Sequence, residues 1–380
     1  MIYLDAAATS AVRREVLEAM WPYLTGDFGN PSSHHTVGES AARALADARA
    51  TVAEWLGCRP SDVVFTSGGT EADNLAVKGI ALATPRGRHI VTTPIEHEAV
   101  LESVDYLRRL HGFEVTFVDV DGTGLVDPSD FAAALREDTT LATVMLANNE
   151  IGTVQPVAEL AAIAHERRIP FHTDAVQAAG WLDLGSAALG VDALSISGHK
   201  LGAPKGIGAL FVRGRIPVEP VIHGGGQERG RRSGTENVAG AVGLAAAIRL
   251  GEDGRHSRAE TTAAARDAFV TAVLARVPQA ALTGHPVRRL PASASFVFPG
   301  TSGESVLLEL ERRGIVSSSG SACAAGSGEA SHVLLALRFE EEIAQTAVRF
   351  SWGPEVGAPE LAAVADAVGE AVETVAAITQ

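Results

Sequence analysis

The chain has 380 residues and a formal net charge of −15, from 31 Lys plus Arg and 46 Asp plus Glu. Its length suits either two to three domains or one large α/β domain with a smaller partner. Its acidic balance argues against direct nucleic-acid binding, which needs clustered positive charge. With only Cys58 and Cys323, neither a disulfide framework nor a cysteine metal cluster is expected, so no metal site is predicted. The start of the chain carries no signal-peptide pattern, and no segment reaches the roughly 18 apolar residues of a membrane span. A cytoplasmic protein without membrane contact is therefore expected.

The first elements in chain order lead to a possible anion site. A helical pattern over residues 12–24 is followed by a loop at 29–35 and a long helix over 40–56. A buried strand at 62–66 then breaks at Ser67-Gly68-Gly69 and enters a helix from Thr70. A strand, a glycine turn and a helix in this order direct backbone N–H groups at an anion.

Strands and helices alternate through the middle of the chain. Strands are predicted at 89–93, 113–118, 142–146, 170–172, 191–197 and 206–212, with helices at 99–110, 129–135 and 157–167. Such alternation indicates an α/β fold with a mainly parallel sheet, whose ligands bind beyond the carboxyl ends of the strands. Polar clusters fall at those ends, at 69–70, 96–97, 148–150, 174–177 and 197–200.

The last third of the chain indicates a second domain. A glycine-rich basic tract at 223–235 predicts a flexible loop, a helix is predicted over 237–250, and the polar run 251–258 is typical of a domain junction. Beyond it, helices mix with strands around 294–298 and 347–350. The predicted division is a large domain over 12–255 and a small α+β domain made of 1–11 and 256–380.

The lysine at the end of the strand over 191–197 is a candidate nucleophile. Lys78, Lys200 and Lys205 are the three lysines of the chain, and arginine supplies nearly every other cation. Arginine cannot lose its proton in a protein, whereas a desolvated lysine can, and so it can form an imine. Lys200 follows Ser197-Gly198-His199 at the carboxyl end of the strand. It is either the imine-forming residue or an ordinary surface cation.

Four other residues each allow a functional and a structural interpretation. Asp174 could pair with a protonated ring nitrogen, as a pyridoxal phosphate ring requires, or could cap a turn. His97 could relay protons near neutral pH or be structural. Thr70 could bind phosphate or be an ordinary N-cap. Arg349 could clamp a substrate carboxylate through two hydrogen bonds or form an ion pair between domains.

The two cysteines have different surroundings. Cys323 lies within residues 316–328, a run of small residues that predicts an exposed, mobile loop, so its thiol is a candidate nucleophile. Cys58 follows a helix between Gly57 and Arg59. It is interpreted as structural.

Ten stretches of the chain, taken in order, resemble the cysteine desulfurases of the class V aminotransferase family (NifS- and IscS-like). These are pyridoxal-phosphate enzymes of the aspartate-aminotransferase fold type. The stretches are 3–5, 28–33, 66–74, 96–97, 148–152, 174–177, 197–200 with 204–206, 232–235, 318–323 and 349–351. The order Ser318-Ser319-Gly320-Ser321-Ala322-Cys323 and the long span to Arg349 are similar to the longer-loop class. The resemblance implies pyridoxal-phosphate fold type I, with a large domain built on a mainly parallel sheet and a smaller α+β domain.

The resemblance also implies a role for each site residue. Three would be catalytic: Lys200 as the imine-forming lysine, Cys323 as the sulfur acceptor and His97 stacked on the ring. Asp174 would be the partner of the pyridine nitrogen. The other expected cofactor contacts are Gly69, Thr70, Ser197 and His199 at the phosphate, Gln177 and Asn149 near the ring hydroxyl and substrate, with Asn148 as an alternative to Asn149, and Thr235 at the phosphate of the neighbouring subunit. Thr235 would thus imply a homodimer, and Asn30 and Arg349 would hold the substrate carboxylate.

The implied activity converts L-cysteine to L-alanine and leaves a persulfide on Cys323. The sulfur would then pass to an acceptor protein, an iron–sulfur scaffold or a tRNA thiolase. Two features depart from the family pattern: Ala324-Ala325-Gly326 after Cys323 is smaller and more flexible than usual, and the sequence ends at Gln380 without the extended tail by which some members dock a scaffold. The second departure leaves the acceptor open. The alternatives are another lyase or aminotransferase of the same fold, such as selenocysteine lyase, or a cofactor-binding scaffold without turnover.

Overall fold

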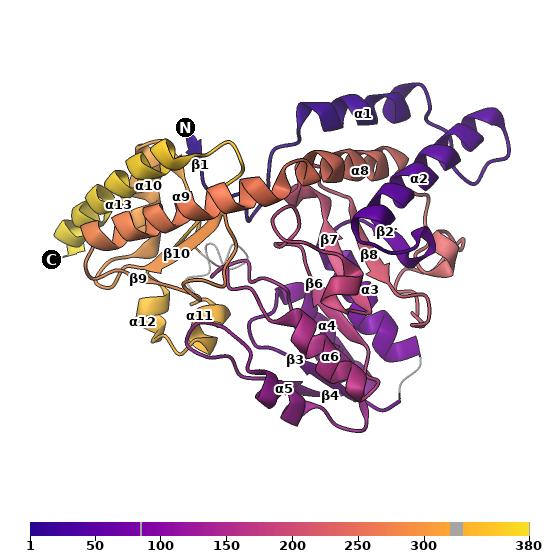
Figure 1. Cartoon of the computed structure of the whole chain (residues 1–380), viewed down its shortest axis with the longest axis horizontal. Coiled ribbons are helices and arrows are strands. Elements are labelled where there is room, and N and C mark those ends of the chain that lie inside the picture. The colour runs from indigo at the N-terminus through magenta and orange to yellow at the C-terminus, as the bar shows by residue number, and fades with distance from the viewer. Residues whose placement is uncertain (84–85, 320–329, 380) are drawn as a thin grey trace.

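The computed structural model describes residues 1–83, 86–319 and 330–379, and a seven-stranded sheet forms the centre of its larger part (Figure 1). The strand order is β2-β8-β7-β6-β5-β3-β4. Neighbouring strands are parallel except at β8, which runs antiparallel to both β2 and β7. The mainly parallel sheet predicted from the alternating pattern is therefore present. Its strands are β2 (Val63–Thr66), β3 (His89–Thr92), β4 (Glu114–Phe117), β5 (Thr139–Thr143), β6 (Phe171–Asp174), β7 (Ala193–Ser197) and β8 (Gly208–Val212).

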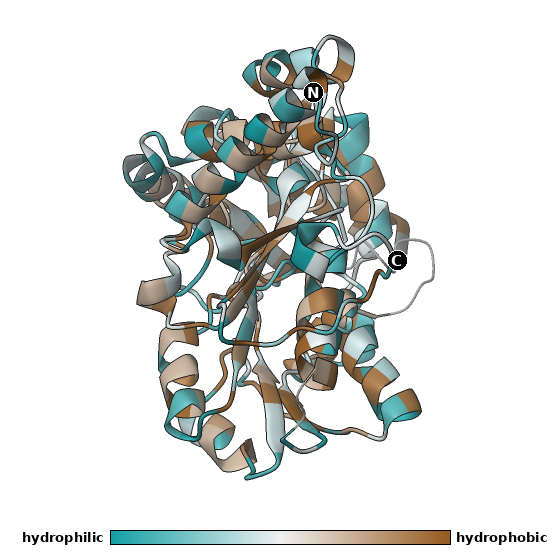
Figure 2. Cartoon of the chain, turned by 90° about the vertical axis from the view of Figure 1, so that its right-hand side faces the viewer, coloured by the Kyte–Doolittle hydropathy of each residue, from teal (hydrophilic) through white to brown (hydrophobic). Residues whose placement is uncertain are grey.

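Apolar residues on both faces of this sheet explain why helices pack against each face. Successive strand residues point to opposite faces, so Ile90 and Leu141 pack on one side while their neighbours Val91 and Ala142 pack on the other. Figure 2 shows the central strands as mainly hydrophobic. On the first side lie α3 (Gly69–Ala83) and α4 (Glu98–His111); on the second lie α2 (Thr36–Trp55), α5 (Pro128–Ala134), α6 (Val157–Glu166) with α7 (Ser186–Leu189), and α8 (Val238–Glu252), on which α1 (Arg14–Thr25) packs.

A smaller antiparallel sheet organises the C-terminal part. Its order is β12-β10-β9, and a separate two-stranded parallel sheet pairs β1 with β11. The N-terminal residues therefore pair with the C-terminal part of the chain, although the exact division into domains remains a prediction. The elements are β1 (Ile2–Tyr3), α9 (Arg255–Arg276), β9 (Ala281–Leu282), β10 (Ser293–Val297), α10 (Gly303–Arg312), β11 (Ile315–Val316), α11 (His332–Ala336), α12 (Glu341–Ala344), β12 (Ala347–Ser351) and α13 (Ala358–Thr379).

Several predicted boundaries differ from the structure by a few residues; the helix predicted from residue 40, for example, begins at Thr36. Strand β5 begins three residues earlier than predicted and ends at Thr143, because its pairing with β3 stops at Ala142, although Val144 and Leu146 still donate to the carbonyls of His172 and Asp174 beside β6. The predicted junction over 251–258 is nearly all helix. Helix α8 ends at Glu252, α9 begins at Arg255, and the turn between them is made at Gly254, which has φ +64°.

None of the helices in the described ranges is both long enough and apolar enough to cross a bilayer.

Candidate active site

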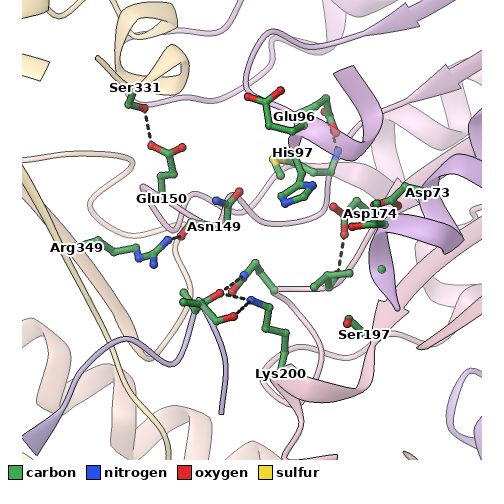
Figure 3. Close-up of a pocket in the computed structure, with 18 of the residues that line it drawn as sticks. Asp73, Glu96, His97, Asn149, Glu150, Asp174, Ser197, Lys200, Ser331 and Arg349 are labelled. Carbon is green, nitrogen blue, oxygen red and sulfur yellow. Dashed lines mark hydrogen bonds between the residues drawn. The ribbon is translucent and has the colours of Figure 1, made fainter. Parts of the chain in front are cut away.

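A cavity of about 660 Å³ opens at the carboxyl ends of the parallel strands (Figure 3). Strands β6 and β7 end in Asp174 and Ser197, and the segments after β3 and β5 supply His97 and Asn149. The carboxyl ends of parallel strands lie along the same edge of the sheet, which is why residues far apart in sequence meet here. The predicted site residues that line the cavity are Gly69, Thr70, His97, Asn149, Asp174, Gln177, Ser197, His199, Lys200 and Arg349.

At one end of the cavity the backbone is packed so closely that a side chain larger than glycine would not fit. A Cβ on Gly69, the first residue of α3, would lie 2.7 Å from the Cγ2 atom of Val176. A Cβ on Gly208 would lie 2.7 Å from the backbone of Gly68. The backbone of the turn before α3 therefore approaches the end of β7, where Ser197 lies. A helix start with Thr70 and Ser197 beside it offers N–H and O–H donors to a bound anion.

The lysine amine lies against the N-terminal segment. Lys200 ends a short 3₁₀ turn after β7, and its Nζ donates to the carbonyl of Ala8 at 2.7 Å and also to that of Ala7. The Gln177 amide donates to the same Ala7 carbonyl at 3.0 Å. Backbone carbonyls thus hold the two side chains beside each other in the cavity.

Three buried carboxyl groups line the cavity: Asp73, Glu96 and Asp174 (Figure 3). Burial raises the pKa of Glu96 to about 8, and burial together with the nearby Asp174 raises the pKa of Asp73 well above its usual range. Burial also raises the pKa of Asp174, but the neighbouring His97 and Lys200 offset part of that rise. Two carboxylates cannot both ionise in one buried site at low cost. Of the three, only Asp174 has cationic neighbours that lower its pKa, so it is the carboxyl group whose charged form the site favours most, whereas Glu96, with a pKa of about 8, is mainly protonated at neutral pH.

The histidine and the asparagine of the cavity are held by local hydrogen bonds. His97 caps α4, and its Nδ1 accepts from the Ala99 amide at 3.0 Å, so Nε2 is the nitrogen that can carry or exchange a proton. Asn148 is fully buried, and its side-chain oxygen accepts from the amides of Glu150 and Ile151. Because these hydrogen bonds occupy the side chain of Asn148 within the turn, Asn149 is the asparagine that faces the cavity.

Arg349 forms the opposite end of the cavity. It lies on β12 and is 1% exposed. Its Nη1 donates to the Asn149 carbonyl at 3.0 Å, and its Nη2 pairs with the Asp5 carboxylate at 2.7 Å. Asp5 and Arg349 both belong to the predicted small domain, so this ion pair is not the pair between domains that was the alternative for Arg349; it places the guanidinium at the cavity wall.

Two predicted site residues among the described ones are not brought to this cavity. Asn30 is exposed in the loop after α1, and its side chain accepts from the Ser32 amide at 2.9 Å. Thr235 is also exposed and does not line the cavity of its own chain. Cys323 lies outside the described residues.

The loop that carries Thr235 is anchored, whereas the sequence predicted a flexible one. Arg49 and Glu228 are both buried and form two hydrogen bonds, at 2.6 and 2.7 Å. Arg229 donates to the Val63 carbonyl at 2.6 Å, and Glu228 and Arg229 have φ angles of +48° and +59°. Non-glycine residues hold such angles only where surrounding contacts enforce them. The loop is therefore fixed against β2.

Sequence reasoning selected Asp174 but not the other buried acids of the cavity, Asp73, Glu96 and Glu150. Asp73 follows Gly69 and Thr70 by about one helical turn, a spacing that places it on the same side of α3 and could have indicated it. Glu96 precedes His97 in a stretch already noted as polar. Glu150, whose carboxylate accepts from Ser331 at 2.5 Å, carries no comparable signal because Ser331 is 181 residues away.

These features define the class of protein. The closely packed turn at Gly69, the buried Asp174 and the amine of Lys200 fit the phosphate, the ring nitrogen and the aldehyde of pyridoxal phosphate. The fold and the cavity are those of a pyridoxal-phosphate enzyme of the aspartate-aminotransferase fold type.

Comparisons with known proteins lead to the family. The model of the aminotransferase class-V family matches residues 2–364. A cysteine desulfurase IscS from Dictyoglomus turgidum is 47% identical over 93% of this chain and 89% of its own length. Among solved structures, a NifS-like protein matches with a TM-score of 0.91 at 36% identity, covering 98% of this chain and 99% of that one. The structure described as SspA in complex with cysteine matches with a TM-score of 0.82 at 36% identity, covering 93% and 99%. The chain belongs to the aminotransferase class-V family, with the cysteine desulfurases as its relatives, and pyridoxal phosphate is its cofactor.

Proposed function

We propose that this protein is a homodimeric cysteine desulfurase that converts L-cysteine to L-alanine and carries the sulfur as a persulfide on Cys323. One observation carries the proposal: Lys200, Asp174 and Arg349, drawn from three distant parts of the chain, line one cavity at the strand ends. They are the groups needed to bind a pyridine cofactor and an amino acid together. The family relatives named cysteine desulfurase support the choice of substrate.

Each cofactor contact follows from the position of its side chain. Gly69, Thr70, Ser197 and His199 would hold the phosphate, Asp174 would hold the ring nitrogen, and Lys200 would hold the aldehyde carbon. Gln177 and Asn149 would lie at the ring hydroxyl and the substrate. When bound, pyridoxal phosphate supplies an electron sink for the carbon skeleton of the substrate.

The charges in the cavity suit this binding. His97 and Lys200 favour the charged form of Asp174, which can then hold a proton on the ring nitrogen, while burial favours the neutral forms of Glu96 and Asp73 and so limits competing negative charge. Burial, with the nearby Lys200 and Lys205, lowers the pKa of His199 to about 4, so His199 is neutral at pH 7 and serves as a hydrogen-bonding group. His97 can exchange a proton through Nε2 while its Nδ1 stays fixed to Ala99.

Substrate binding rests on Arg349. Its planar guanidinium can hold the α-carboxylate of cysteine through two hydrogen bonds. Lys200 can move protons at the substrate α-carbon, since its amine lies in the same cavity. Asn30 stays a predicted carboxylate contact, which the cavity of a single chain does not supply.

Sulfur leaves the substrate by attack of a thiolate. The Cys323 sulfur would form an S–S bond with the substrate sulfur while the C–S bond breaks, its electron pair stays with carbon, and a proton completes the alanine methyl group. Cys58 is unsuited to this step because burial raises the pKa of its thiol to about 12. The persulfide would then pass its outer sulfur to an acceptor protein, an iron–sulfur scaffold or a tRNA thiolase.

An apolar stripe supports the dimer. Leu17, Trp21 and Leu24 lie on the outer side of α1, and Phe28 follows the helix; all four are more than half exposed. The spacing of four and three residues places Leu17, Trp21 and Leu24 on one face of α1. Figure 1 shows α1 resting on α8 at the edge of the molecule. Exposed stripes of large apolar residues mark protein interfaces. The dimer would allow Thr235 to reach the cofactor phosphate of the partner.

The test follows both products of one cysteine pulse. Purified protein with bound cofactor is mixed with L-cysteine, alanine and sulfide are assayed, and peptides are weighed by mass spectrometry. We expect alanine, and one extra sulfur on the peptide that contains Cys323. Cys323→Ser should keep the cofactor but form no persulfide, whereas the control Cys58→Ser should behave as the parent protein.

Two outcomes would contradict the proposal. Alanine formed without transferred sulfur would favour another lyase or aminotransferase of this fold. A sulfur label on Cys58, or full activity of Cys323→Ser, would mean that Cys323 is not the sulfur carrier.

A further inference from the structure

The N-terminal segment, residues 5–10, touches both ends of the cavity. Its first residue, Asp5, pairs with Arg349 at 2.7 Å, and its Ala7 and Ala8 carbonyls accept from Lys200. These are the groups proposed to hold the carboxylate and the amine of the substrate. A segment outside both the central sheet and its crossover helices therefore links the two contacts that an amino acid makes.

Hydrogen bonds fix this segment in place. The amides of Ala6 and Ala7 donate to the backbone and hydroxyl oxygens of Ser351, at 2.9 and 2.8 Å. The Ser10 hydroxyl donates to the His199 carbonyl at 2.7 Å. Because Ser351 is two residues from Arg349 on β12, Asp5 and Arg349 are held in register. The Asp5 carboxylate is thus a fixed partner of the guanidinium.

The ion pair has two consequences for Arg349. First, contacts from Asp5 to Nη2 and from the Asn149 carbonyl to Nη1 leave the buried guanidinium plane little freedom to turn. Second, a carboxylate at 2.7 Å already balances the positive charge that an incoming α-carboxylate would meet. Orientation favours substrate binding, whereas the neighbouring negative charge opposes it.

We propose that Asp5 is a positioning residue that orients Arg349 and, through its charge, limits how tightly the site holds the α-carboxylate of the substrate. The proposal rests on the assignment of Arg349 as the carboxylate contact. Asp5 then keeps the site selective for a correctly oriented carboxylate while weakening retention of alanine, the carboxylate-bearing product.

Two substitutions separate orientation from charge. Asp5→Asn keeps a side-chain oxygen that can accept from Nη2 and removes the negative charge. We expect it to bind L-alanine about tenfold more tightly, since one of two carboxylates around a single guanidinium is gone. Asp5→Ala removes the oxygen as well, so the guanidinium loses its orientation, and we expect binding about tenfold weaker. A purely structural role would move both variants in the same direction.

The measurement is calorimetric titration of the cofactor-loaded protein with L-alanine, and with ethylamine, which lacks the carboxylate. The Asp5 effects should appear with alanine and not with ethylamine. Asp253→Asn removes the same charge from an exposed turn between α8 and α9 and should leave both affinities unchanged. In steady-state kinetics Asp5→Asn should lower KM for cysteine, with a smaller change in kcat.

The outcomes distinguish this inference from the proposed function. If Asp5→Asn and Asp5→Ala shift alanine affinity in the same direction, or not at all, while Arg349→Lys weakens it, Asp5 does not have this role but the carboxylate contact stands. If Arg349→Lys also leaves alanine affinity unchanged, the assignment of Arg349 itself is wrong.

Discussion

Glu96 offers a test of the buried charges under the cavity, through its replacement by glutamine. The pKa of Glu96 is about 8 in the folded protein, against an ordinary value of 4.5. Between these pH values the unfolded chain has lost a proton that the folded chain keeps, so this group's contribution to stability is complete below pH 4.5 and is lost as the pH rises towards 8. At ~1.36 kcal/mol per pKa unit, the full loss is roughly 5 kcal/mol, of which about 3 kcal/mol falls between about pH 5.5 and about pH 8.5.

Glu96→Gln should remove this pH dependence and keep the packing. The glutamine oxygen can accept from the Thr93 hydroxyl and the Met145 amide, as Oε1 does at 2.7 and 3.0 Å. Urea unfolding of both proteins at the two pH values, followed by circular dichroism, measures the difference in unfolding free energy. We expect this difference to change by about 3 kcal/mol in favour of the variant as the pH rises.

The neighbouring Glu98 provides the control, because its side chain is 45% exposed. Glu98→Gln should not reproduce the shift. If the free-energy difference between parent and Glu96→Gln is the same at both pH values, Glu96 is not held as a neutral acid. The protonation of Glu96 in the folded protein would then need revision.

Three further predictions concern the cofactor, the substrate and the dimer. Lys200→Ala should lose the visible absorption band of the lysine-bound cofactor and Lys205→Ala should keep it; the reverse result would move the imine to Lys205. Arg349→Lys should raise KM for cysteine by about tenfold or more with that band retained, because an ammonium cannot form two parallel hydrogen bonds to a carboxylate; an unchanged KM would place the carboxylate contact elsewhere. If the protein is the proposed dimer, Trp21→Glu, which puts a charge into the exposed stripe of α1, should give a monomer in light scattering and weaken cofactor binding, whereas a persistent dimer would locate the interface on another face.

The sequence determined the central sheet and most of the cavity lining. Strand residues alternate between two faces, so apolar runs such as residues 191–197 predict strands covered by helices on both sides. Polar residues directly after such strands must meet at one sheet edge, which is why His97, Asp174 and Lys200 could be placed in one site before any coordinates. The order of the motifs then indicated the family and its cofactor.

The tertiary structure alone decided how those residues are held and charged. The pKa of Glu96 and that of Asp73 depend on complete burial, which follows from packing across the sheet and not from neighbours in the chain. The choice between Asn148 and Asn149 depended on which of the two side chains is hydrogen-bonded within the turn. The partner of Arg349 is Asp5, 344 residues away. No local pattern encodes such a contact, because it exists only when β12 and the N-terminal segment are brought side by side by the fold.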